Sequence, residues 1–277
     1  MEASQSEKAQ AFRALHARPG AFVIPNPWDV GTARILAGLG FEALATTSAG
    51  MAFALGRRDG AVSRDEALAH ARAIVGATPL PVSADLENGF GDAPEVVAET
   101  IRLAANTGLA GASIEDATGD PDRPIYDASL ALERIAAAVE AARGLPFPFT
   151  LTARAENFLH GRPDLDDTIR RLQSFERAGA DVLYAPGLRD PDAVRTVCQA
   201  VGKPVNVIMS ITGTAFTVGE LAAAGVRRIS LGSALSRVAL GAFLRAAREI
   251  KTEGRFTMAG DAASSAEVEA FMQTRAP

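Results

Sequence analysis

The strongest constraint on the fold is an alternation of short apolar runs with longer helix-like stretches along the whole 277-residue chain. Short runs rich in β-formers, separated by amphipathic segments, are typical of parallel strands joined by helices. The pattern predicts eight strands, at residues 21–27, 43–47, 81–87, 110–115, 148–154, 181–185, 204–208 and 228–231. Eight such units in succession predict one TIM-type (β/α)8 barrel that occupies residues 1–277 as a single domain.

Helix-like stretches fill the intervals between these strands. They are expected at residues 28–37, 64–77, 94–106, 130–142, 165–178, 191–201 and 218–224. From about residue 234 the chain continues into a helical extension, with helices expected at 235–250 and 265–273. A doubly wound sheet is the alternative, but the first expected strand is not followed by the glycine-rich turn of a dinucleotide-binding unit.

Composition excludes several classes of partner. The formal net charge of −5 argues against a nucleic-acid-binding surface. No apolar run approaches the roughly 18 residues of a membrane span, and the first residues lack a signal-peptide core. The lone cysteine, Cys198, cannot form an internal disulfide. We therefore expect a cytoplasmic protein with neither nucleic acid nor membrane as a partner.

Charged side chains stand at the ends of three neighbouring expected strands. SADLENGFGD places Asp85 and Glu87 at one strand end, ASIED places Glu115 at the next, and FTLTAR places Arg154 at the third. Because side chains alternate faces along a strand, the apolar neighbours of these residues would face the helices and the charges would face the barrel mouth. Active sites of such barrels lie at that end. The alternative for each acid is a helix cap or an ion pair with arginine.

These carboxylates suit a hard divalent cation. Asp85 and Glu87 are two residues apart, roughly 6.6 Å along a strand, so both backbones cannot lie close to one small ion. One carboxylate would bind directly and the others through water, which suits Mg²⁺, with Mn²⁺ as a substitute. Arg154 offers a planar fork for a substrate carboxylate. Its alternative is an ion pair with Glu115 or Glu156.

The small polar segment at the end of the second expected strand allows two interpretations. The segment TTSAG, residues 46–50, is either an anion-binding turn of backbone N–H groups or a tight turn that needs small residues. The histidines His16, His70 and His160 show no metal-ligand spacing and are expected on the surface.

The chain resembles the isocitrate lyase/phosphoenolpyruvate mutase superfamily over nearly its whole length. The matching segments are PWDVGTARIL, GFEALATTSAG, LGRRDG, ADLENGFGD, GASIED, TARAENFL and GVRRISLGSAL. The resemblance implies a (β/α)8 barrel whose last helix is exchanged between subunits of a homodimer or homotetramer. It also implies Mg²⁺-dependent chemistry on small 2-oxo or 2-hydroxy carboxylates through a metal-stabilised enolate.

The resemblance also implies roles for individual residues. Asp85 would bind the metal directly, Glu87 and Glu115 would bind it through water, and Asp59 would lie near its water shell. Arg154 would bind the substrate. The backbone N–H and hydroxyl groups that would hold the substrate carboxylate belong to Thr47, Ser48 and Ala49.

The loop at residues 117–128 departs from the superfamily. Lyases carry a loop there with lysine, cysteine and histidine, whereas this chain has ATGDPDRPIYDA. Tyr126 is the one side chain in this loop that could serve as a weak acid, and a purely structural connection is the alternative. The leading hypothesis is a carbon–carbon lyase or decarboxylase for a 2-oxo or 2-hydroxy di- or tricarboxylate. A phosphonopyruvate hydrolase or mutase, or a 2-oxo acid binding protein with little catalysis, remain alternatives.

Overall fold

The eight predicted strands form one parallel sheet in a computed structural model that describes residues 3–209 and 216–273. The order is β1-β8-β7-β6-β5-β4-β3-β2, so each strand lies beside its neighbour in sequence and β1 pairs with β8. The strands are β1 (Phe22–Ile24), β2 (Leu44–Ala45), β3 (Val82–Asp85), β4 (Gly111–Glu115), β5 (Thr150–Arg154), β6 (Val182–Tyr184), β7 (Val205–Ile208) and β8 (Arg228–Ser230). The ends of the predicted domain, Met1 and Pro277, lie outside the described residues.

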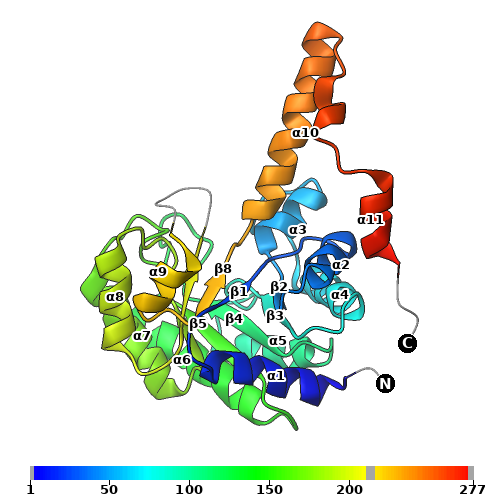
Figure 1. Cartoon of the computed structure of the whole chain (residues 1–277). Coiled ribbons are helices and arrows are strands. Elements are labelled where there is room, and N and C mark those ends of the chain that lie inside the picture. The colour runs from blue at the N-terminus through cyan, green and yellow to red at the C-terminus, as the bar shows by residue number, and fades with distance from the viewer. Residues whose placement is uncertain (1–2, 210–215, 274–277) are drawn as a thin grey trace.

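The sheet curls into a nearly closed barrel (Figure 1). The Ala45 N–H donates to the Pro25 carbonyl at 3.0 Å, which joins the ends of β1 and β2. The Asn26 side chain strengthens this junction by donating to the Thr46 carbonyl and by accepting from the Leu231 and Gly232 N–H groups, each at 2.9 Å. One asparagine thus joins β1, β2 and β8 at the barrel mouth. The predicted (β/α)8 fold is confirmed.

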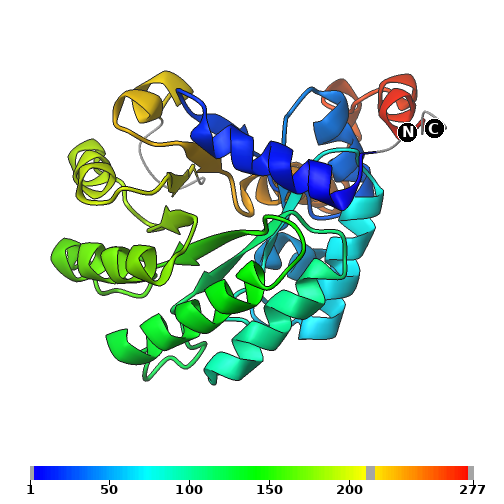
Figure 2. The same ribbon diagram turned by 90° about the horizontal axis from the view of Figure 1, so that it is seen from below.

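Helices cover the outside of the barrel (Figure 2). They are α2 (Val30–Gly38), α4 (Arg64–Gly76), α5 (Pro94–Ala105), α6 (Ala128–Arg143), α7 (Leu165–Ala178), α8 (Pro191–Ala200) and α9 (Val218–Ala223). Their apolar sides and the outward sides of the strands form the main core, in which residues such as Ile101, Ile114 and Leu151 are almost completely buried. None of the described helices is long and apolar enough to cross a lipid bilayer.

Two α-helices among the described residues were not predicted. Helix α1 (Gln5–Ala17) begins with a Ser4–Glu7 capping box and lies below the strands in Figure 1, so that it is in front of the barrel when seen from below in Figure 2. Its buried residues are only Ala9, Phe12 and His16, so the sequence shows a short apolar face and a weak helical signal. Helix α3 (Ser48–Ala54) begins at the segment expected to be a turn, and the Thr47 hydroxyl caps it by accepting from the Gly50 N–H at 3.2 Å.

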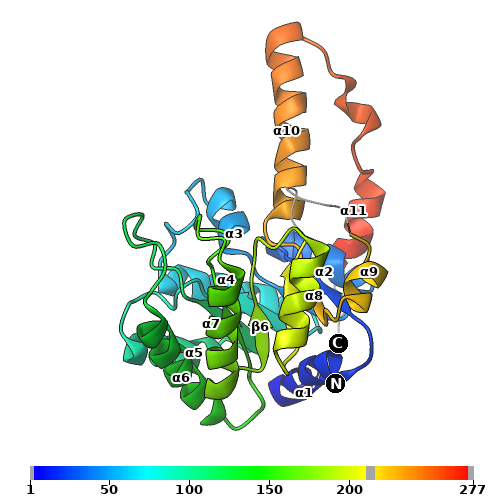
Figure 3. The same cartoon turned by 90° about the vertical axis from the view of Figure 1, so that its left-hand side faces the viewer.

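The C-terminal extension projects away from the barrel (Figures 1 and 3). Helix α10 (Ala234–Glu253) exposes large apolar side chains, while the short η1 (Thr257–Gly260) and α11 (Ser265–Met272) lead the chain back to α2. The Arg34 guanidinium of α2 donates to the Met272 carbonyl at 3.1 Å and so holds the end of α11 against α2. The predicted exchange of α10 between subunits stays a prediction.

Candidate active site

Three of the predicted site residues meet at the carboxyl ends of β3, β4 and β5. Glu115 and Arg154 are register partners, and Asp85 ends the adjacent strand, where its N–H donates to the Thr46 hydroxyl at 2.9 Å. Ala84 and Ala153, which precede Asp85 and Arg154, are buried on the outward side, as strand alternation requires. The apolar pattern of each strand therefore positions these charges at the mouth.

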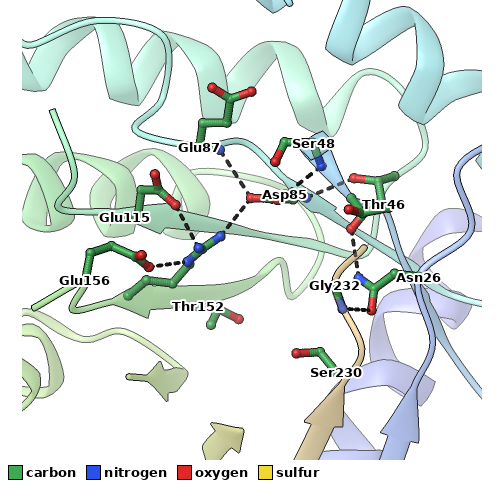
Figure 4. Close-up of polar contacts among 12 residues, drawn as sticks. Asn26, Thr46, Ser48, Asp85, Glu87, Glu115, Thr152, Glu156, Ser230 and Gly232 are labelled. Carbon is green, nitrogen blue, oxygen red and sulfur yellow. Dashed lines mark hydrogen bonds and ion pairs between the residues drawn. The ribbon is translucent and has the colours of Figure 1, made fainter. Parts of the chain in front are cut away.

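Arg154 is the centre of this cluster, and Figure 4 labels its acidic partners Asp85, Glu115 and Glu156. Its guanidinium pairs with Asp85 at 2.9 Å, Glu115 at 2.9 Å and Glu156 at 2.8 Å. The expected ion pair with Glu115 or Glu156 is confirmed for both, and Asp85 is an additional partner. Burial alone would lower the pKa of Arg154, but the three carboxylates outweigh it and hold that pKa above its ordinary value. The arginine is therefore permanently charged.

Glu87 is placed differently from the prediction. Strand β3 ends at Asp85, and Glu87 has a φ of +50°, so strand alternation does not set its direction. Its N–H donates to Asp85 Oδ1 at 3.4 Å, and its carboxylate has neither a hydrogen bond nor an ion pair with any described residue. Burial, followed by repulsion from Asp85 and Asp59, raises the pKa of Glu87 to about 7. Glu87 is thus an unneutralised acid at the mouth.

Ser48 and Asp59 complete the mouth on the side of α3. The Ser48 N–H donates to Asp85 Oδ2 at 3.2 Å. Burial and then repulsion from Asp85 raise the pKa of Asp59, while a hydrogen bond with the Ser48 side chain opposes that rise. Burial likewise raises the pKa of Glu115, although Arg154 opposes the shift. Burial is the largest cause of each of these pKa shifts, and repulsion between the neighbouring acids adds to it.

The donor set fits a Mg²⁺ ion held mainly through water. Within residues 3–209 and 216–273, no three His, Cys, Asp or Glu side chains converge as ligands of one ion. Mg²⁺ needs no such convergence, because it keeps several waters and uses one or two carboxylates together with substrate oxygens. The acids at the mouth outnumber the guanidinium of Arg154, and a divalent cation would neutralise the excess. These acids are Asp59, Asp85, Glu87, Glu115 and Glu156.

The mouth opens into two adjacent cavities that share part of their lining. The outer cavity, of about 970 Å³, is lined by Glu87, Glu115, Glu156 and the loop residues 117–119. The inner cavity, of about 220 Å³, is lined by Thr47, Ser48, Ala49 and Asp85 and extends down to Asn206 and Arg228. Ser48, Asp59 and Arg154 line both cavities. A small substrate could therefore contact Asp85 and Arg154 while reaching into the barrel.

Tyr126 lies apart from both cavities. Its phenol donates to Asp92 Oδ1 at 2.6 Å and accepts from Asn88 Nδ2 at 3.2 Å, and its ring stacks 4.1 Å from the Arg134 guanidinium. Burial and the bond to Asp92 raise the pKa of Tyr126 to about 12. These contacts give the residue a structural function in the loop. Its catalytic function stays a prediction.

Sequence reasoning missed residues inside the barrel. His16, expected on the surface, is 7% exposed, and its ring packs edge-to-face with the rings of Phe12 and Phe22. Arg228 is also buried and lines the inner cavity. The strand-alternation argument applied to Arg228-Ile229-Ser230 would have placed Arg228 and Ser230 inside, because Ile229 is the apolar residue that faces the helices.

Comparison with known proteins agrees with this geometry. Residues 12–251 match the family described as phosphoenolpyruvate phosphomutase. The chain belongs to this family. Its homologues are members of the isocitrate lyase/phosphoenolpyruvate mutase superfamily and include lyases and mutases. The family thus confirms the enzyme class, while the reaction depends on features of this chain.

Three similar proteins illustrate the range of sequence identity between this chain and its relatives. A crystal structure of a candidate lyase/mutase from Burkholderia cenocepacia J2315 is 61% identical, with a TM-score of 0.95 over 98% of this chain and 97% of that one. The 2-methylisocitrate lyase of Salmonella typhimurium is 30% identical over 78% of this chain and 76% of its own length. Oxaloacetate acetylhydrolase in complex with the inhibitor 3,3-difluorooxalacetate is 26% identical, with a TM-score of 0.85 over 97% and 93% of the two chains.

Proposed function

We propose that this protein is a Mg²⁺-dependent enzyme that cleaves or decarboxylates a small 2-oxo or 2-hydroxy di- or tricarboxylate at a carbon–carbon bond. The observation that carries the proposal is the cluster at the strand ends, where Arg154 pairs with three acids while Glu87 has no partner. A metal cation would neutralise the excess of acidic side chains, and an anionic substrate would pair with the fixed guanidinium of Arg154. The lyases among the relatives support the reaction class.

The residues that would hold Mg²⁺ are Asp85 directly, and Glu87 and Glu115 through water. Asp59 would accept hydrogen bonds from the metal's water shell, since it lies beside Ser48 at the same mouth. Mn²⁺ could replace Mg²⁺ with the same oxygen ligands. Bound Mg²⁺ supplies a Lewis acid that polarises the 2-oxo group and stabilises negative charge as it develops there.

The chain itself supplies binding and orientation. Ala49 would donate its N–H group to the substrate carboxylate, and Ser48 would do so by exchanging the bond of its N–H to Asp85 Oδ2 for one to the substrate. The Thr47 and Ser48 hydroxyls lie at the same helix start. Arg154 would orient the substrate, because its guanidinium is immobilised by three carboxylates and needs no reorganisation. No cysteine, lysine or histidine in residues 117–128 is available to move a proton at carbon. We therefore expect weak cleavage of isocitrate or methylisocitrate.

A turnover panel tests this proposal. Oxaloacetate, 2-methylisocitrate and phosphonopyruvate would each be assayed with Mg²⁺ and with EDTA. Mg²⁺-dependent turnover of oxaloacetate or a related 2-oxo dicarboxylate is the expected result. Turnover of phosphonopyruvate alone would favour the mutase or hydrolase alternative, and Mg²⁺-dependent binding without any turnover would favour a binding protein.

We also propose that the protein is a homodimer or homotetramer. Helix α10 leaves Val238, Phe243 and Leu244 exposed by 62%, 67% and 47%. Apolar side chains spaced along one helix are commonly buried against a partner subunit. Exchange of α10 between copies of this chain would bury them.

A further inference from the structure

The interior of this barrel is polar in the layer below the active site. Barrels of this fold are usually filled there by branched apolar side chains. Here the buried interior residues include Ser83, Ser113, Thr152, Asn206 and Arg228. All except Thr152 line the inner cavity, which continues upward to Asp85 and Arg154. The small polar side chains leave space that larger apolar ones would fill.

Arg228 is held inside the barrel by neutral groups. Its Nε donates to Asn206 Oδ1 at 2.8 Å and its Nη2 donates to Thr152 Oγ1 at 3.0 Å. Asn206 in turn donates to the Ser230 hydroxyl at 3.0 Å. These bonds fix the guanidinium but supply no negative charge.

His16 provides the third partner from below. Its Nδ1 lies 2.8 Å from the Phe12 carbonyl, so Nδ1 must carry the proton and Nε2 must be the acceptor. Nε2 faces Arg228 Nη1 at 3.5 Å, a long contact. Burial and then the charge of Arg228 lower the pKa of His16 to about 3, so the imidazole is neutral. His16 therefore supplies Arg228 with no counter-charge.

No carboxylate pairs with Arg228 in residues 3–209 and 216–273. The described ionisable groups that interact with it are the neutral His16, Tyr184 and Arg154, and Arg154 has the same sign. An isolated buried cation is costly unless it is paired. A guanidinium has five N–H donors, and described residues engage only three of those of Arg228. The remaining donors and the charge are available to an anion in the inner cavity.

We infer that Arg228 forms the floor of a second anion subsite, which receives the distal carboxylate of the substrate whose other end lies at Asp85 and Arg154. This inference rests on the proposed function and makes Arg228 a specificity-determining residue. The inner cavity of about 220 Å³ joins the two positions. A substrate with two anionic ends occupies both cationic groups, whereas a monocarboxylate leaves Arg228 unpaired.

Calorimetry with two ligands tests the subsite. In the presence of Mg²⁺, 3,3-difluorooxaloacetate carries a second carboxylate, whereas pyruvate does not. A hydrogen bond to a charged group contributes enough to change affinity by about 10–150-fold, so we expect the wild type to prefer the difluoro compound by that factor. Arg228→Gln should lose this preference and retain its affinity for pyruvate. Arg227→Gln is the matched control, because Arg227 contacts the Gly20 carbonyl at 3.3 Å in an exposed position.

Several outcomes would overturn the inference. Equal affinity of the wild type for 3,3-difluorooxaloacetate and pyruvate would overturn the inference, and this result does not depend on whether Arg228→Gln folds. An equal loss of both ligands in Arg228→Gln would show general damage rather than a subsite. If acetate strengthened pyruvate binding and the protein showed no preference for the dicarboxylate, Arg228 would bind a free anion and not the distal carboxylate of the substrate. Binding of neither ligand would reject the proposed function itself, whereas binding without preference rejects this inference alone.

Discussion

Replacing Arg154 with methionine should destabilise the protein in a pH-dependent manner. The change removes the cation from ion pairs with Asp85, Glu115 and Glu156, and the Arg154 side chain is only 13% exposed. Removing one partner of a buried pair costs about 3–5 kcal/mol, because the other charge is left uncompensated. The three bonds share one desolvated guanidinium, so the cost should not triple. For a chain of this size the cost corresponds to a fall in Tm of about 6–20 °C at pH 8.

The pH dependence follows from the acids left behind. Burial already raises the pKa values of Glu115 and Glu156, and Arg154 opposes that rise in both. Without the arginine both values rise further above the unfolded value, so the folded variant binds more protons than the unfolded chain. Its stability relative to the wild type should therefore decrease as pH increases. The deficit should be largest near pH 8 and smaller near pH 6.

Thermal unfolding followed by circular dichroism at pH 6 and pH 8, without metal, measures both effects. Arg102→Met is the control, because the Arg102–Glu99 pair is exposed and contributes at most about 1 kcal/mol. The reasoning is refuted if Arg154→Met unfolds no earlier than the control. It is also refuted if the deficit is greater at pH 6 than at pH 8.

Three other predictions concern the metal, the assembly and the loop. Because the pKa of Glu87 is about 7 without metal, Mg²⁺ must displace a proton from Glu87 at low pH. Calorimetry should therefore show Mg²⁺ binding about tenfold weaker at pH 6 than at pH 8. A Glu87→Gln variant with the same ratio of Mg²⁺ affinities at the two pH values would contradict this assignment to Glu87. Light scattering should give a mass of two or four times 28.8 kDa. The double variant Phe243→Glu/Leu244→Glu should have a lower mass, because it places charges on the exposed apolar side of α10. A monomeric wild type at micromolar concentration would count against exchange of α10. Isocitrate and methylisocitrate should be cleaved far more slowly than the order of 10 per second typical of enzymes, and a rate of that order would show that residues 117–128 can replace the missing thiol.

The sequence allowed prediction of the barrel and of the strand-end charges, because both depend on local periodicity. Asp85, Glu115 and Arg154 each follow an apolar neighbour that must face the helices, so alternation alone places them at the mouth. The left-handed backbone of Glu87, at φ +50°, depends on how the chain leaves β3, and the strand pattern contains no sign of it.

Contacts across the barrel could not be predicted. The partners of Arg228 are Asn206, Thr152 and His16, which lie 22, 76 and 212 residues away in the chain. His16 belongs to a helix whose short apolar face resembles that of a surface helix. Only closure of the barrel over α1 makes this histidine an interior residue.

Mg²⁺ binding by Asp85 is the central claim, and calorimetry of metal titrated into the apoprotein at pH 8 tests it most directly. Asp85→Ala removes the proposed direct ligand, and Asp122→Asn, an exposed loop acid outside both cavities, is the control. We expect the wild type and Asp122→Asn to bind Mg²⁺ with similar affinity and Asp85→Ala to show no measurable binding while it remains folded by circular dichroism. Unchanged Mg²⁺ affinity in folded Asp85→Ala would contradict the assignment of the strand-end acids as a metal site.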